Sequence, residues 1–112
     1  MRILRYATSG GKDLIMEYID ALPTEDRILG YIMIEDFETK GMEAFKYYET
    51  RVLKKPLYEI KINKNRYAYL LVDGETLVIL HAFKKEKNKT EKPDLDLALK
   101  RMKSILKGGI KK

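Results

Sequence analysis

Hydrophobic residues in the first part of the chain recur at helical spacing. In residues 14–22 and again in residues 24–41, apolar side chains lie three or four positions apart, which is the repeat of one helix face. Pro23 separates the two stretches because a proline ring clashes with the preceding helical turn, and Thr24 is a suitable N-cap for the second helix. The front of the chain is therefore predicted to be a short strand at Ile3–Tyr6 followed by a helical hairpin.

The hydrophobic period changes to two residues after position 56. Residues 57–62 alternate between apolar and polar side chains, which indicates a strand with one wet face. Residues 66–72 and 76–83 are almost continuously apolar, so we expect central strands that helices cover on at least one face. Asp73 and Gly74 between them are a strong signal for a hairpin turn.

A last helical stripe runs from Leu95 to Leu106, with Thr90 as its expected N-cap and Pro93 in its first turn, where a missing amide hydrogen is tolerated. Together the patterns predict an α+β fold, in which an antiparallel β-sheet packs against two N-terminal helices and one C-terminal helix. We expect residues 1–107 to form a single domain and residues 108–112 to form a basic tail.

Composition narrows the possible chemistry. The chain has no cysteine and one histidine, which excludes disulfides, thiolate sites and multi-histidine metal sites, so no metal or other cofactor is expected. Its apolar runs are far shorter than the ~20 residues of a membrane span, and Arg5 interrupts the start of any signal peptide, which together predict a cytoplasmic protein. The net charge of +6 divides into −4 for residues 1–50, +3 for 51–80 and +7 for 81–112. This asymmetry favours a polyanionic partner, although a solvated lysine-rich surface would look the same.

Cations and aromatic residues are interleaved in the second half of the chain. If the strands bring Lys61, Arg66 and the segment from Lys84 to one edge of the sheet, the site suits single-stranded RNA. The phosphates of single-stranded RNA need cations, and its unstacked bases need aromatic faces. The candidate RNA-contacting residues are Lys55, Lys64, Lys84, Lys89, Tyr67 and Phe83.

Four segments of the same region resemble a known family. They are KPLYEIK at 55–61, NRYAY at 65–69, LHAFKK at 80–85 and KT at 89–90. They are similar to the RelE/HigB superfamily of toxin–antitoxin ribonucleases, in its phage-derived, HigB-like branch, whose pattern runs L-W-E-L-R, R-x-x-Y and L-H-x-F-x-K-K-x-x-K-T-P. Tyr58 stands where that family often has Trp, Lys61 where it usually has Arg, and Glu91 where it has Pro. The change at Lys61 matters because an ammonium and a guanidinium fork are not equivalent at a phosphate.

The resemblance implies a RelE-like fold and a metal-independent endoribonuclease that cleaves messenger RNA, typically on the ribosome. In such toxins the ribose 2′-hydroxyl attacks the adjacent phosphate, so the protein must supply positive charge and proton transfer. By resemblance, Lys61, Arg66 and Lys85 surround the scissile phosphate and Lys89 guides the RNA backbone. The resemblance also implies a cognate antitoxin of the helix-turn-helix type.

Several residues have two interpretations. His81 is a candidate acid or base with a pKa suited to neutral pH, or a strand histidine satisfied by a backbone or carboxylate partner, as expected if Ile79 and Phe83 share its helix-packed face. Glu59, on the wet side of its strand, is a candidate base or the partner of Lys61. Tyr67, like Tyr69, fits a core ring as well as a stacking surface for bases.

Two other functions remain open. The departure at Lys61 is compatible with a RelE-like module that has lost cleavage and acts in nucleic-acid binding or in assembly of the toxin–antitoxin complex. The basic helix at Leu95–Leu106 is compatible with a DNA-binding co-repressor, although its cations also fit a solvated helix face.

Overall fold

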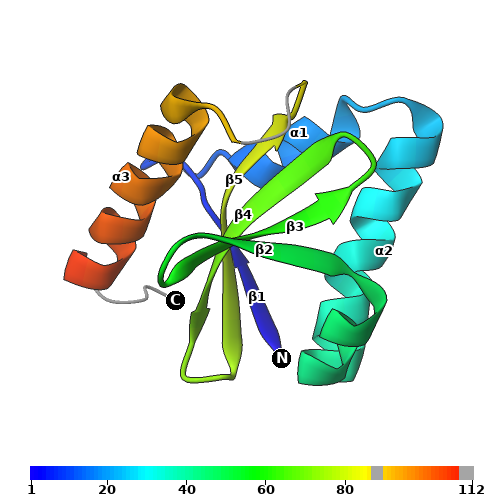
Figure 1. The fold of residues 1–112 in the computed structure, drawn as a ribbon, viewed down its shortest axis with the longest axis horizontal. Coiled ribbons are helices and arrows are strands. Elements are labelled where there is room, and N and C mark those ends of the chain that lie inside the picture. Colours follow the sequence, from blue (N-terminus) through cyan, green and yellow to red (C-terminus); the bar gives the residue numbers. More distant parts are fainter. Residues whose placement is uncertain (87–89, 109–112) are drawn as a thin grey trace.

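A five-stranded sheet lies at the centre of the computed structural model, which describes residues 1–86 and 90–108 (Figure 1). Three α-helices and one 3-10 helix surround this sheet, which confirms the α+β class. The elements are β1 (Arg2–Arg5), α1 (Leu14–Asp20), α2 (Thr24–Lys40), η1 (Gly41–Tyr47), β2 (Glu49–Lys54), β3 (Leu57–Ile62), β4 (Asn65–Val72), β5 (Thr76–Lys84) and α3 (Lys92–Gly108).

The strands lie in the order β1-β5-β4-β3-β2, and β2 to β5 form an antiparallel meander. The expectation of a wholly antiparallel sheet is wrong at one edge, because β1 pairs with β5 in parallel. The chain leaves β1, passes through α1, α2 and η1, and enters the sheet again at its other edge through β2. The sheet is therefore mixed.

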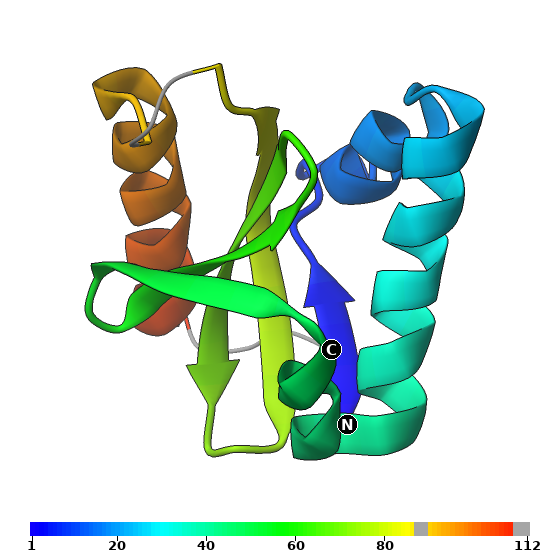
Figure 2. The ribbon, with the colours of Figure 1, turned by 45° about the vertical axis from the view of Figure 1, so that its right-hand side comes forward.

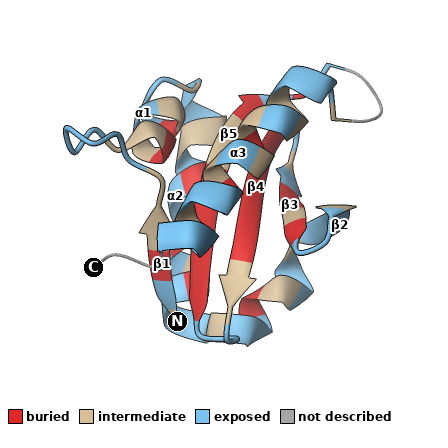
Figure 3. Ribbon diagram, turned by 90° about the vertical axis from the view of Figure 1, so that its left-hand side faces the viewer, coloured by how far each residue is buried: buried red, intermediate tan, exposed pale blue. Residues whose placement is uncertain are grey.

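Helices cover both faces of the sheet, with α2 on one side and α3 on the other (Figures 1 and 2). One apolar core joins α1 and α2 to alternate strand residues such as Ile60, Tyr67 and Ile79. The second core lies beneath α3 and includes Leu57 and Leu80, and Figure 3 shows α3 lying over the buried part of β4. Burial on both faces explains why β4 and β5 are almost continuously apolar.

The helical hairpin is confirmed, with changes at its ends. The first helix ends at Asp20, two residues before the expected end, and Thr24 is the first residue of α2 and not its N-cap. The carboxylate of Asp13 caps α1 by accepting hydrogen bonds from the backbone amides of Ile15 and Met16. The two helices approach closely at Gly30, where a Cβ atom would lie 2.8 Å from the Cγ2 atom of Ile19.

Two elements were not predicted, namely η1 and the edge strand β2. The predicted hairpin between β4 and β5 is confirmed, and both Asp73 and Gly74 adopt the positive φ that such a turn requires. Gly108, assigned above to a tail, is the last residue of α3, and residues 109–112 lie outside the described residues. Within the described ranges, the structure contains no helix whose length and apolar character would allow it to cross a membrane.

Candidate functional site

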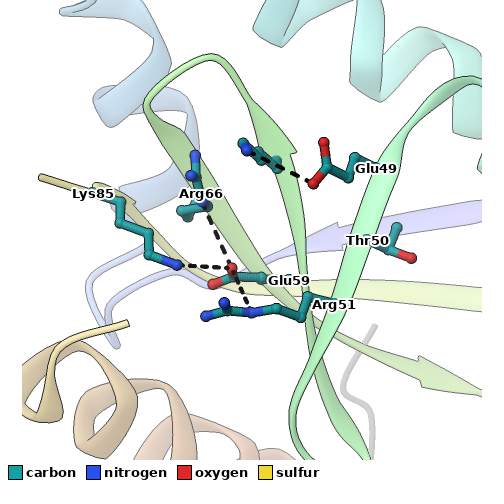
Figure 4. A pocket seen from close by; sticks show the side chains of 7 residues that line it. Glu49, Thr50, Arg51, Glu59, Arg66 and Lys85 are labelled. Carbon is teal, nitrogen blue, oxygen red and sulfur yellow. Dashed lines mark ion pairs between the residues drawn. The ribbon is translucent and has the colours of Figure 1, made fainter. Parts of the chain in front are cut away.

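A cavity of about 140 Å³ lies where β2, β3, β4 and the segment after β5 meet (Figure 4). The strand register brings its charged side chains together. Arg51 is paired with Glu59, and Lys61 is paired with both Glu49 and Arg66. Because directly opposite residues on neighbouring strands project from the same face, these side chains converge on the side of the sheet that α3 covers. The cavity is lined by Glu49, Thr50, Arg51, Glu59, Lys61, Arg66 and Lys85.

The cavity is built around the buried carboxylate of Glu59, which is only 2% exposed. Its Oε2 atom lies 3.6 Å from Arg51 Nε, 3.6 Å from Arg66 Nε and 3.8 Å from Lys85 Nζ. Its Oε1 atom accepts a hydrogen bond of 2.7 Å from the Thr90 hydroxyl. Three cations therefore surround one carboxylate, and the expectation that Glu59 lies on a wet face is wrong because Thr90 and these cations enclose it.

Arg66 is held in place by the turn that precedes it. Its Nη1 atom donates hydrogen bonds to the carbonyl oxygens of Asn63, at 2.7 Å, and Asn65, at 3.1 Å. Its Nε atom is buried and has no hydrogen-bond partner among the residues that the structure describes, although Glu59 lies nearby. Because two backbone carbonyls fix one end of the guanidinium group, the rest of the group keeps a constant orientation along the cavity wall.

Lys85 is buried beside these guanidinium groups, with only 4% of its side chain exposed. Its backbone amide donates to the carbonyl oxygen of Lys64, so the segment after β5 is tied to the turn between β3 and β4. Burial lowers the pKa of Lys85 from its ordinary value, the positive charges of Arg51 and Arg66 lower it further, and Glu59 opposes the shift. A lysine in such surroundings releases a proton more readily than an exposed one.

Lys61 lies at the rim of the cavity. Its Nζ atom is 3.7 Å from Glu49, and 44% of the Lys61 side chain and 72% of the Glu49 side chain are exposed. Glu59 was interpreted above as the partner of Lys61, but the ion pairs of Glu59 are with Arg51, Arg66 and Lys85. The structure thus brings Lys61, Arg66 and Lys85 together as expected, with Lys61 in the most exposed position.

His81 does not line this cavity. Its Nε2 atom is 2.8 Å from the Asp94 carboxylate of α3, and its ring stacks on Phe83. Burial lowers the pKa of His81, and the hydrogen bond to Asp94 partly opposes that shift. A register shift near Ala68 interrupts the alternation of β5, so Ile79 and Phe83 lie in different cores rather than on one face. The contacts match the interpretation of a histidine satisfied by a carboxylate partner.

The prediction that two aromatic residues, Tyr67 and Phe83, contact RNA is wrong because both are buried. Tyr67 has no exposed surface, and it packs in the core beneath α1 and α2. Phe83 is 6% exposed and belongs to the core beneath α3. Neither ring offers a face on which an RNA base could stack, so both are core residues.

The lysine candidates are spread over several positions. Lys64 and Lys84 are exposed at the end of the sheet that carries the cavity. Lys55 is exposed in the turn before β3, six residues from Lys61, which corresponds to about 20 Å along a strand and places it away from the cavity. Lys89 lies outside the described residues.

Sequence reasoning missed Arg51, Glu49 and the contact made by Thr90. Residues 49–54 do not alternate between apolar and polar side chains, and the segment is short and mostly exposed, so the sequence carried little signal for strand β2. Thr90 was expected to cap the last helix, which begins at Lys92, and instead its hydroxyl donates to Glu59.

A family model described as "Phage derived protein Gp49-like (DUF891)" matches residues 17–103, which is most of the chain and includes all of the cavity. The chain belongs to the Gp49-like family. This family is associated with RelE/HigB-like toxins, so the match agrees with the resemblance at the level of the wider group. Among curated proteins, none matches the sequence. The roles of residues in this Gp49-like protein therefore have to be argued from its own geometry.

Proposed function

We propose that this Gp49-like protein is the toxin of a type II toxin–antitoxin system and acts as a metal-independent endoribonuclease on messenger RNA, at the ribosome in the cytoplasm. A cognate antitoxin of the helix-turn-helix type restrains it by covering the cavity. The observation that carries the proposal is the convergence of Arg51, Lys61, Arg66 and Lys85 in one cavity. Two of these cations are buried, so water screens their charge less than it would on an open surface.

The proposed reaction is a transesterification within the RNA. The 2′-oxygen loses its proton and forms a bond to the adjacent phosphorus, the bond from phosphorus to the 5′-oxygen breaks, and that oxygen takes up a proton. The products are a 2′,3′-cyclic phosphate and a 5′-hydroxyl. Arg66 and Arg51 stabilise the charge that develops on the phosphoryl oxygens, and Lys85, whose pKa is lowered by burial, exchanges a proton with the reacting oxygens.

The decisive experiment measures cleavage of messenger RNA during translation by purified protein in the presence of a chelator. Cuts that end in a 5′-hydroxyl are expected from the wild type. Lys85→Met, Arg66→Met and Arg51→Met should each lower the cleavage rate by about 10²-fold or more, as loss of one charge-stabilising group does in other enzymes. Lys61→Met should have a smaller effect, because Lys61 lies at the rim and pairs with the exposed Glu49 and not with the central carboxylate of Glu59.

Lys46→Met is the matched control, since it removes one lysine charge from an exposed position in η1 that is paired with Glu43. It should cleave like the wild type. Circular dichroism of each variant establishes that the fold is retained. Binding of RNA without any cleavage would favour the non-cleaving module and would overturn the enzymatic proposal. Full activity in Lys85→Met, Arg66→Met and Arg51→Met would overturn the assignment of this cavity as the active site.

A further inference from the structure

The three consecutive residues Asn63, Lys64 and Asn65 form the β3–β4 turn, which holds two cations of the cavity in place. The backbone carbonyls of Asn63 and Asn65 accept hydrogen bonds from Arg66 Nη1, at 2.7 and 3.1 Å. The carbonyl oxygen of Lys64 accepts a hydrogen bond of 2.7 Å from the backbone amide of Lys85. Because these carbonyls belong to one short turn, a displacement of the turn moves Arg66 and Lys85 together.

The helical hairpin holds the β3–β4 turn from the other side of the sheet. The turn lies beside α1 and the start of α2 (Figures 1 and 2). From α1, the Tyr18 hydroxyl donates a hydrogen bond of 2.6 Å to Asn65 Oδ1. In the first turn of α2, Asp26 accepts a hydrogen bond of 2.8 Å from Asn63 Nδ2. Each helix is therefore linked to the Arg66 guanidinium through one asparagine, whose side chain binds the helix and whose carbonyl binds the arginine.

Tyr18 is the better shielded of the two anchors. Its acceptor, Asn65, is only 1% exposed, so water competes little for the hydrogen bond. The Tyr18 ring packs edge-on against Tyr67, with the ring centroids 6.1 Å apart, which fixes the direction of the hydroxyl. Burial raises the pKa of Tyr18 to about 12, and nearby carboxylates act in the same direction, so the hydroxyl remains a donor at neutral pH. The hydrogen bond to Asp26 lies on the exposed surface and holds the turn less firmly.

We infer that Tyr18, supported by Asp26, is a positioning residue for the proposed active site: it fixes the β3–β4 turn, and through the turn it places Arg66 and Lys85. The inference rests on the proposed function for its effect on cleavage, and on the contacts alone for its effect on the turn. Fixed charges stabilise a transition state only where negative charge develops, and a misplacement of about 1 Å can lower a rate by roughly 10²-fold. A change at Tyr18 should therefore slow the chemical step without weakening RNA binding.

Tyr18→Phe and Tyr31→Phe form a matched pair of variants. Both remove one hydroxyl from the helical hairpin, but the Tyr31 hydroxyl donates to Asp20 within the hairpin and not to the turn. In the cleavage assay on translated messenger RNA, Tyr18→Phe should lower the maximal rate about tenfold and change the substrate concentration at half-maximal rate by less than about twofold. Tyr31→Phe should cleave like the wild type. Asp26→Ala should have a smaller effect than Tyr18→Phe, and Glu25→Ala, in the same turn of α2, is its control.

NMR measures the hold on the turn without requiring activity. Deuterium exchange of the Lys85 amide reports the opening of its bond to Lys64, and rotation of the Arg66 guanidinium about its Cζ–Nε bond reports the grip of the two carbonyls on Nη1. Both rates should rise about threefold or more in Tyr18→Phe, as expected for the loss of one hydrogen bond, and should stay unchanged in Tyr31→Phe. A residue that only stabilises the fold would instead accelerate amide exchange in all strands alike.

The inference and the proposed function can fail separately. Faster motion at Arg66 and Lys85 in Tyr18→Phe, in a protein that does not cleave RNA even as the wild type, would support the positioning of the turn and reject the nuclease. Cleavage by Tyr18→Phe at the wild-type rate would overturn the inference and leave the nuclease in place. Slower cleavage with unchanged motion at Arg66 and Lys85, or a loss confined to RNA binding, would overturn it as well.

Discussion

Replacing Glu59 by glutamine tests whether one carboxylate holds the cation cluster together. The buried partners, Arg66 and Lys85, lie 3.6 and 3.8 Å from its Oε2 atom. At an effective dielectric constant of about 20, a charge pair at such a distance contributes roughly 4.5 kcal/mol, so the two pairs contribute roughly 9 kcal/mol before desolvation. The pair with Arg51 is discounted because 46% of that side chain is exposed.

Removing the charge also removes the unfavourable desolvation of a buried carboxylate, which amounts to several kcal/mol. The net loss expected for Glu59→Gln is therefore about 3–5 kcal/mol in the free energy of unfolding, as found for other buried pairs that lose one partner. Glu49→Gln is the matched control. It makes the same substitution in the same cavity, but its pair with Lys61 is exposed and should contribute only about 0–1 kcal/mol.

Urea denaturation followed by far-ultraviolet circular dichroism measures both changes. If Glu59→Gln leaves too little folded protein for a baseline, Thr90→Val provides a milder test, because it removes only the hydrogen bond to Oε1 and should destabilise by about 1 kcal/mol. Losses below about 1 kcal/mol for Glu59→Gln, equal to those for Glu49→Gln, would refute the reasoning that the carboxylate organises the cations.

Two further predictions concern the cores on either side of the sheet. The Tyr67 hydroxyl is buried and has no hydrogen-bond partner in the described part of the chain, so Tyr67→Phe should leave the free energy of unfolding unchanged or raise it by about 1 kcal/mol in urea denaturation. A clear loss would mean that the hydroxyl is satisfied in solution. Burial holds the pKa of His81 below its usual range. As the pH falls, the unfolded chain takes up a proton at His81 near pH ~6.5, whereas the folded protein does so only at lower pH. Protonation therefore favours the unfolded state, and the free energy of unfolding decreases as the pH drops below about 6.5. Between pH 7.5 and pH 5.5, the free energy of unfolding measured by urea denaturation should decrease less in His81→Gln than in the wild type. Equal decreases would contradict a lowered pKa of His81 in the folded protein.

Local patterns in the sequence were sufficient to predict most elements of the fold. Helical spacing identified α1, α2 and α3, and continuous apolar runs around Asp73 and Gly74 identified β4 and β5. The parallel pairing of β1 could not be predicted, because a strand of four residues carries no information about which neighbour it will join. The edge strand β2 was missed for a related reason. It packs on one neighbour only, and five of its six residues are exposed.

The site was predictable where residues belong to a motif and unpredictable where a second element decides their surroundings. The strand pattern correctly placed Glu59 on the face opposite Ile60, but it could not indicate that Thr90 would close over that face. In the same way, Tyr67 and Phe83 stand among cations in the sequence, although alternate faces of the strands bury both rings in different cores. Linear proximity to cations therefore does not distinguish a stacking ring from a core ring.

The position of Arg51 bears on the departure at Lys61 from the family pattern. A lysine offers a point charge, whereas an arginine offers a planar fork that matches two phosphate oxygens. The side chains of Lys61 and Arg51 are similarly exposed, at 44% and 46%, and Arg51 reaches the same cavity from the neighbouring strand with its Nε atom 3.6 Å from Glu59. Together with Arg66, this gives the cavity two guanidinium groups. Because strand pairing, and not sequence position, determines which cations meet, a guanidinium missing from β3 is supplied by β2, and the cavity keeps the group suited to a phosphate.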